Sequence, residues 1–272
     1  MSYKALLTHV VADRGCASRL RVAASVAQAF GAELIGVGAR APWPYASVED
    51  GRGVEFESIL GATQDAITEA KGVFKETLKR HAIAKAWRAE VGYPDDVIAK
   101  HARAADLVIG YPARRGVDRA LYATPDGLLM EAGLPILLIP AAEVEFRAET
   151  VLLAWKNTQE ARRAISVAMP LLQTAERVLV AAVCRDREVA TIEQELADVA
   201  ARLTRHGVKV ATLVEVEAPG AVGRRLLHIA EADKSDLIVA GGYGHSRLRE
   251  WALGGVTRDL IADGRRFVLL SR

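Results

Sequence analysis

Five glycines gather in one short stretch near the C-terminal end of the sequence. The segment "GGYGHSRLREWALGGVTRDLI", residues 241–261, contains Gly241, Gly242, Gly244, Gly254 and Gly255. A glycine has no Cβ, so backbone N–H groups beside it can approach a ligand closely, and a helix N-terminus adds unpaired donors and a partial positive charge. The chemistry that this pattern favours is the binding of an anion such as phosphate. The alternative is that the glycines serve only tight turns.

The elements around these glycines would place them at the end of a strand. The letters "SDLIVAGGYGHS" (235–246) predict a strand that runs directly into the first glycines, and "GGVTRDLIAD" (254–263) predicts the start of the following helix. Open parallel sheets bind ligands at the carboxyl ends of their strands, beside the point where the strand order reverses. We therefore expect the glycines to lie at such an edge.

The whole chain reads as two copies of one pattern. Residues 4–39 and 149–183 each predict an apolar strand, an alanine-rich amphipathic helix and a second strand. Asp106 and Asp236, each at the start of a later strand, are 130 residues apart. Because the strands are continuously apolar, they are typical of parallel sheets that helices cover on both faces. The sequence thus predicts an α/β fold with two tandem open-sheet domains, residues 1–142 and 148–272.

Composition narrows the classes of function. The chain has 272 residues, of which 51% are apolar, and its formal net charge is only +2, so a strong field toward nucleic acid is not expected. The longest apolar runs are too short for a membrane span, which favours a cytoplasmic protein without a membrane partner. The only cysteines, Cys16 and Cys184, lie far apart, and the six histidines show no metal-ligand spacing. No metal site and no catalytic residues are predicted.

The glycine spacing resembles a known signature. Gly241-x-x-Gly244, nine further residues and then Gly254-Gly255-Val256-Thr257 are similar to the motif G-2x-G-9x-G-(S/T) of the universal stress protein family. The resemblance extends along the whole chain, as a tandem two-domain member. It implies five-stranded domains of the adenine nucleotide alpha hydrolase-like type. It also implies that the domains pair through their last strands, so that the chain forms an intramolecular pseudo-dimer, and it leaves further association into a homodimer open.

The resemblance also implies a ligand and its contacts. The ligand would be ATP or another adenine nucleotide, bound in the C-terminal domain, and Ala154 and Lys156 would lie on the adenine side. The phosphate side would comprise Gly241, Gly244, His245, Ser246, Gly254, Gly255, Val256 and Thr257.

Two residues of the second domain depart from the family pattern. Gly255 stands where nucleotide-binding members have Ser or Thr, so one hydroxyl is missing, although Thr257 partly compensates. Lys156 stands where the family has an Asp at the end of the first strand. A lysine cannot accept a hydrogen bond from an adenine amino group, but it can pair with a phosphate. Lys156 is thus an obstacle to adenine, a partner of a phosphate or of an acidic neighbour, or a residue outside the site.

The first domain departs in the opposite way. It keeps an acid, Asp13, near the end of its first strand, but Thr124 and Pro125 stand where Gly254 and Gly255 would fall at the same offset. Proline has no N–H to donate. The phosphate loop of this domain is therefore expected to be degenerate.

Three functions remain open on these grounds. The first is a stress-response binding module whose conformation or choice of partner responds to an adenine nucleotide. The second is a slow ATP hydrolase, for which His245 is the only candidate to position water. The third is an interaction protein that has lost nucleotide binding, which Lys156 and the degenerate first loop favour. No P-loop motif supports phosphoryl transfer.

Overall fold

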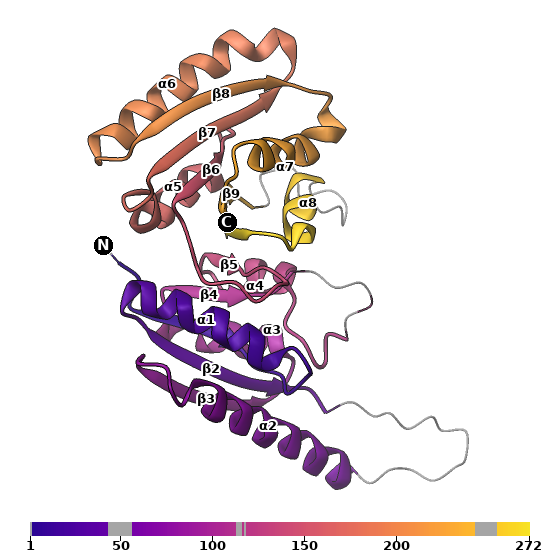
Figure 1. The fold of residues 1–272 in the computed structure, drawn as a ribbon. Coiled ribbons are helices and arrows are strands. Elements are labelled where there is room, and N and C mark those ends of the chain that lie inside the picture. The colour runs from indigo at the N-terminus through magenta and orange to yellow at the C-terminus, as the bar shows by residue number, and fades with distance from the viewer. Residues whose placement is uncertain (1, 43–55, 113–115, 117, 243–254) are drawn as a thin grey trace.

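The computed structural model describes residues 2–42, 56–112, 116, 118–242 and 255–272. Its first half alternates strands and helices in the predicted order (Figure 1). The elements are β1 (Ala5–His9), α1 (Cys16–Phe30), β2 (Glu33–Arg40), α2 (Phe56–Leu78), β3 (Lys85–Val91), α3 (Pro94–His101), the 3₁₀ turn η2 (Ala102–Ala104), β4 (Leu107–Gly110), α4 (Pro125–Glu131) and β5 (Ile136–Leu138).

The second half repeats this order. Its elements are β6 (Thr150–Ala154), α5 (Gln159–Leu172), β7 (Arg177–Cys184), η3 (Asp186–Glu188), α6 (Val189–Arg205), β8 (Val210–Val216), η4 (Pro219–Ala221), α7 (Val222–Ala232), β9 (Leu237–Gly241), α8 (Gly255–Asp263) and β10 (Phe267–Ser271). We use "first half" for β1 to β5 and "second half" for β6 to β10, each with its intervening helices.

The ten strands form one sheet in the order β3-β2-β1-β4-β5-β10-β9-β6-β7-β8. All neighbouring strands are parallel except β5 and β10, which pair antiparallel with Leu137 opposite Leu269. The predicted α/β fold with a mostly parallel sheet is confirmed, but the two sets of five strands belong to one continuous sheet.

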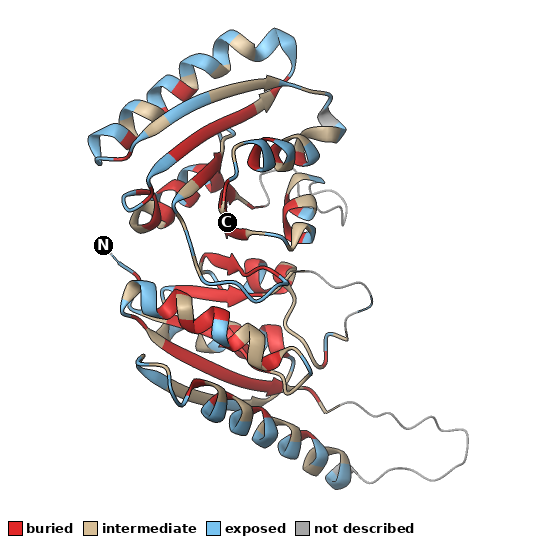
Figure 2. Cartoon of the chain, in the orientation of Figure 1, coloured by how far each residue is buried: buried red, intermediate tan, exposed pale blue. Residues whose placement is uncertain are grey.

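Helices cover both faces of this sheet, and the core lies between the layers (Figures 1 and 2). Apolar side chains of α1, α2, α5 and α6 pack on one face, and those of α3, α4, α7 and α8 pack on the other. Successive strand residues alternate between the faces: Leu6 belongs to the first cluster and Leu7 to the second, and both are fully buried. Burial on both faces is why these strands are apolar throughout.

Aromatic side chains join the two halves beside the β5–β10 pair. The ring of Tyr3 lies 4.9 Å from that of Phe30, which lies 6.0 Å from Phe146 in the connecting segment, and Phe146 lies 4.9 Å from Phe267 at the start of β10. The Tyr3 hydroxyl donates to the Val167 carbonyl of α5. The connecting segment is therefore packed into the structure.

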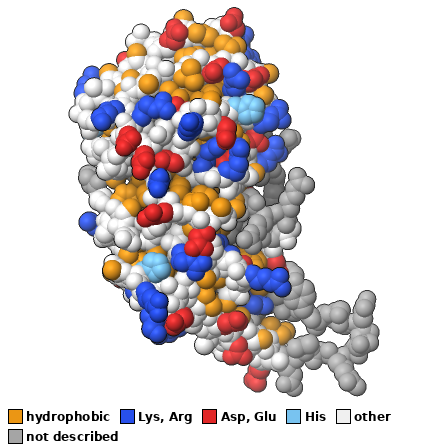
Figure 3. Space-filling view, viewed as in Figure 1, with side chains coloured by type: hydrophobic (Ala, Val, Ile, Leu, Met, Phe, Trp, Pro, Cys, Tyr) orange, Lys and Arg blue, Asp and Glu red, His pale blue; other side chains and the backbone are white. Residues whose placement is uncertain are grey.

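The outer surface mixes charges of both signs. On the face drawn in Figure 3, lysines and arginines are interspersed with acidic side chains, and no large region of a single sign is seen. Among the described residues, no helix has the length and apolar character that crossing a bilayer requires.

The β5–β10 contact yields a first prediction. The Leu269 side chain in β10 is fully buried, so Leu269→Ala should lower the free energy of unfolding by about 2 to 5 kcal/mol. Urea denaturation followed by circular dichroism measures the loss. As a control, Val216→Ala at the half-exposed end of β8 should change it by no more than about 0.5 kcal/mol. Equal effects of the two substitutions would contradict a major contribution of the β5–β10 pair to stability.

Candidate functional site

The sheet contains two points where the strand order reverses. In the first half the chain leaves β1 toward β2 and later returns to β4 on the other side of β1; in the second half β6 lies between β7 and β9 in the same way. Thr8 is opposite Ile109 across the first of these junctions, and Ala154 is opposite Ala240 across the second. The crevices beyond the carboxyl ends of β1 and β4, and of β6 and β9, are where a fold of this kind binds ligands.

Six of the predicted nucleotide-binding residues lie within the described part of the chain. Ala154 ends β6, Gly241 ends β9, and the α8 helix begins with Gly255, Val256 and Thr257. Lys156 follows β6 and is exposed. The structure thus brings Ala154 and Gly241 to adjacent strand ends. The predicted residues Gly244, His245, Ser246 and Gly254 lie outside the described residues.

Gly241 and Gly255 differ in what requires a glycine. A Cβ at Gly241 would lie 2.6 Å from the backbone nitrogen of Ala161, because the first turn of α5 packs against the end of β9. A Cβ at Gly255 would meet no described atom within 4 Å, and Gly255 is exposed. Packing therefore explains the glycine at 241, whereas packing against the described residues does not explain the one at 255.

The first turn of α5 fixes the backbone beside Lys156. Thr158 is the N-cap of α5, and its hydroxyl accepts a hydrogen bond from the Ala161 N–H at 3.3 Å. The Thr158 N–H donates to the carbonyl of Lys156 at 2.7 Å. This tight turn holds the Lys156 backbone at the strand end, while its ammonium group forms no ion pair with a described residue.

The hydrogen bonds of the sheet show which positions of the two halves correspond. The N–H that follows β1, from Val10, donates to the Val37 carbonyl, and the N–H that follows β6, from Trp155, donates to the Ala181 carbonyl. Val10 therefore corresponds to Trp155, His9 to Ala154 and Val11 to Lys156. By the same count Asp13 corresponds to Thr158, so it is not the counterpart of Lys156.

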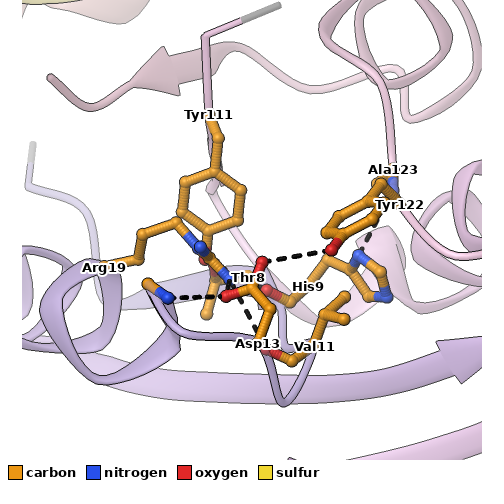
Figure 4. A network of polar contacts seen from close by, with 9 residues as sticks. Thr8, His9, Val11, Asp13, Arg19, Tyr111, Tyr122 and Ala123 are labelled. Carbon is orange, nitrogen blue, oxygen red and sulfur yellow. Dashed lines mark hydrogen bonds and ion pairs between the residues drawn. The ribbon is translucent and has the colours of Figure 1, made fainter. Parts of the chain in front are cut away.

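Side chains of the protein itself occupy the first crevice (Figure 4). Tyr111 follows β4 at the place where the second half has Gly241, and its hydroxyl donates to the His9 carbonyl at 3.0 Å. The guanidinium carbon of Arg19 lies 4.8 Å from the centre of the Tyr111 ring. The same guanidinium donates to Asp13 at 2.8 Å, and the Tyr122 hydroxyl donates to the other Asp13 oxygen at 3.2 Å.

Asp13 is ionised in this network. Partial burial raises the pKa of its carboxyl group, but the hydrogen bond and charge of Arg19, together with the Gly15 N–H, outweigh burial and lower the pKa overall. Asp13 is thus already paired with a cation of the same chain. This arrangement leaves it poorly suited to serve as a free acceptor for a ligand.

A carboxylate also occupies the beginning of α4, the helix that corresponds to α8. The Asp95 side chain is buried and accepts the Thr124 N–H at 2.7 Å and the Thr124 hydroxyl at 2.9 Å. Gly127 lies so close to Asp95 that a Cβ there would be 2.1 Å from a carboxylate oxygen. A carboxyl group of the protein itself therefore lies at the beginning of α4.

His9 is held in one neutral form. Its Nε2 lies 2.9 Å from the Ala39 carbonyl and its Nδ1 accepts the Ala123 N–H at 3.2 Å. The proton is therefore on Nε2. Complete burial, with the nearby Arg19 charge, lowers the pKa of His9 to about 4 although the Ala39 hydrogen bond acts in the opposite direction. The sequence motif search missed this residue, because an isolated histidine in a strand carries no spacing signal.

A small cavity opens beside the first crevice. It has a volume of about 180 Å³ and lies among the carboxyl ends of β1 and β2, the middle of α2, and Leu121 and Tyr122. Asp13 lines it, together with apolar side chains of α2 and of the segment that follows β1. Among the described residues, no group of three or more His, Cys, Asp or Glu side chains is placed to hold a metal ion.

The buried state of His9 predicts a pH dependence of stability. Between pH 6.5 and about 4 the unfolded chain takes up a proton at His9 that the folded chain does not, so stability falls as the pH falls through this window. The total loss from this residue should be about 3 kcal/mol. Urea denaturation at several pH values measures the free energy of unfolding as a function of pH. Between pH 6.5 and about 4 this free energy should change less steeply with pH for His9→Gln than for the natural protein. Identical slopes would show that His9 is not held neutral.

Comparisons with known proteins identify the fold. No family model and no curated protein matches the chain. A universal stress protein structure from Archaeoglobus fulgidus DSM 4304 superposes with a TM-score of 0.73 at 14% identity, covering 98% of this chain and 96% of that one. A protein classed with the universal stress proteins, from Pseudomonas aeruginosa UCBPP-PA14, gives a TM-score of 0.59 at 14% identity, with coverages of 99% and 93%. Over nearly its whole length, this chain has the universal stress protein fold.

Proposed function

We propose that the protein is a stress-response binding module whose second half binds an adenine nucleotide such as ATP. The phosphates would lie at the beginning of α8, beyond the carboxyl end of β9, and the rest of the nucleotide would extend across the end of β6. The observation that carries this proposal is Gly255 at the start of α8, which is exposed and where a Cβ would meet no described atom within 4 Å.

Gly255 fits a ligand contact better than a structural need. As the first residue of a helix it has no need of a left-handed backbone, and a Cβ would meet no described atom. A phosphate can approach the first N–H groups of α8 closely, because a glycine adds no bulky or branched side chain to the backbone there.

Lys156 supports the same orientation of the ligand. It follows β6, which neighbours β9 in the sheet, and its backbone is held by the Thr158 N–H. Its exposed ammonium group forms no ion pair with a described residue. We assign it to the phosphates, because a cation cannot accept a hydrogen bond from an adenine amino group.

The first half is proposed to support the second half without binding a nucleotide in the same way. Tyr111 occupies the place of Gly241, and Asp95 occupies the approach to α4. The halves would act as a fused pair, with one nucleotide for each chain. The antiparallel β5–β10 contact supports this view, because it joins the last strand of each half.

Substitutions of Gly255 test the proposal directly. Gly255→Ser should strengthen ATP binding by roughly 0.5 to 1.5 kcal/mol, the net value of one added hydrogen bond. Gly255→Val should weaken binding at least tenfold, about 1.4 kcal/mol, because its branched side chain fills the approach. Isothermal titration calorimetry measures both effects.

Gly72→Ser is the matched control, since Gly72 lies in α2 with equally open space around it. It should leave ATP affinity unchanged. If the natural protein and Gly255→Ser both fail to bind ATP at millimolar concentration, the nucleotide proposal is refuted and the interaction-protein alternative is favoured.

Lys156 generates a second test. Lys156→Asp replaces a cation near the phosphates by an anion, so it should weaken ATP binding by roughly 1 kcal/mol or more, beyond the usual value of an exposed ion pair. The loss should shrink as the salt concentration rises, because screening reduces the interaction. Tighter binding of ATP by Lys156→Asp would show instead that the lysine obstructs the adenine.

A further inference from the structure

The two halves differ at one corresponding pair of positions beside their crevices. Val10 corresponds to Trp155 through the hydrogen bonds that follow β1 and β6. The residues that follow the covering helices α2 and α6 can be aligned in the same way. The Leu34 N–H donates to the Ala84 carbonyl just before β3, and the Val178 N–H donates to the Lys209 carbonyl just before β8. Counted back from these carbonyls, the fully buried Leu78 of α2 corresponds to the fully buried Leu203 of α6, and Ala70 corresponds to Glu195.

In the first half this pair is small and faces open space. Val10 and Ala70 are both buried apolar residues, and both line the cavity of about 180 Å³ at the ends of β1 and β2. A cavity of this kind between strand ends and a covering helix has room for a flat group. The size of the two side chains is what leaves it open.

In the second half the corresponding pair, Trp155 and Glu195, has large side chains that are hydrogen-bonded to each other. The indole Nε1 of Trp155 donates to one oxygen of Glu195 at 3.1 Å. The Asn157 side chain donates to the other oxygen of Glu195 at 3.0 Å, and Arg162 donates to the Asn157 oxygen at 2.7 Å. Both oxygens of the carboxylate are thus engaged, and the bonds connect the strand end to α6.

The place that Trp155 takes is where the organic part of a bound nucleotide would extend. With phosphates at α8 beyond β9, the remainder of the ligand crosses the neighbouring strand end, formed by Ala154 and Lys156. Trp155 lies between these two residues in the chain, and its indole donates a hydrogen bond to Glu195 of α6. A base could enter there only by displacing the ring of Trp155, and the hydrogen bond to Glu195 holds that ring in place.

We propose that Trp155 and Glu195 close the base pocket of the second half, so that its ligand is recognised by its phosphate chain and not by its base. The inference rests on the function proposed above and narrows it: adenine is tolerated there, but it contributes little to affinity. Trp155 and Glu195 are therefore specificity-determining residues. The second half accepts triphosphates with different bases, and inorganic tripolyphosphate as well.

The test compares ATP with inorganic tripolyphosphate by isothermal titration calorimetry on the full chain. For the natural protein the two affinities should agree within about threefold, less than 1 kcal/mol. The double variant Trp155→Val with Glu195→Ala recreates the small pair of the first half. It should bind tripolyphosphate as before and ATP at least about tenfold more tightly, because the base gains an apolar pocket.

Two further variants separate the volume of the indole from its hydrogen bond. Trp155→Phe keeps a ring but loses the N–H donor, and it should leave the ratio of the two affinities near one. Glu193→Ala removes an exposed acid from the same helix and should have no effect on the ratio. Thermal unfolding of each variant confirms that it is folded before binding is measured.

The outcomes distinguish this inference from the proposal on which it rests. If the natural protein binds ATP more than about tenfold more tightly than tripolyphosphate, the nucleotide site stands and the closed base pocket is wrong. A folded double variant with no gain for ATP would overturn it equally. If no variant binds either compound, the phosphate site itself fails, and the inference fails with it. The comparison on the natural protein needs no substitution, so it holds even if the double variant does not fold.

Discussion

Parallel strand order is the constraint from which the candidate sites follow. Two parallel neighbours need a crossover between them. In the first half the chain passes from β1 to β2 and β3 on one side and then crosses to β4 on the other side of β1, and β6 to β9 follow the same course in the second half. No crossover between neighbouring strands passes over the strand ends between β1 and β4 or between β6 and β9. Each half therefore has one crevice at this edge of the sheet, and its chemistry depends on a few residues just beyond the strands.

The two crevices have diverged in chemistry while the scaffold has remained alike. The first contains Tyr111, whose hydroxyl donates to the His9 carbonyl, the Arg19–Asp13 ion pair, and the neutral His9 ring, which accepts the Ala123 N–H. Among the described residues, the second presents Gly241, Gly255 and the exposed Lys156. The two crevices thus differ through a few residues at corresponding positions, such as Tyr111 and Gly241.

Much of this was predictable from the sequence, because it depends on local pattern. Continuous apolar runs identified strands buried on both faces, and the twin aspartates have the same role: Asp106 accepts the N–H groups of Lys4 and Ala5, and Asp236 those of Glu149 and Thr150. The link between Trp155 and Glu195 was not predictable, because the segments that separate the strands from α2 and α6 differ in length. Only the hydrogen-bond register shows that Ala70 and Glu195 correspond. The partners of His9 were not predictable either, because Ala39 and Ala123 are 30 and 114 residues away from it in the sequence.

The aromatic contacts of Phe146 change the meaning of the connection between the halves. A flexible tether sets only how often two modules meet, through their effective concentration. Here Phe146 packs between Phe30 and Phe267, and its N–H donates to the Ser25 hydroxyl at 2.9 Å. The connection is thus packed between α1 and β10. Lengthening it would remove packing as well as proximity, so the connection contributes directly to the contact between the two halves.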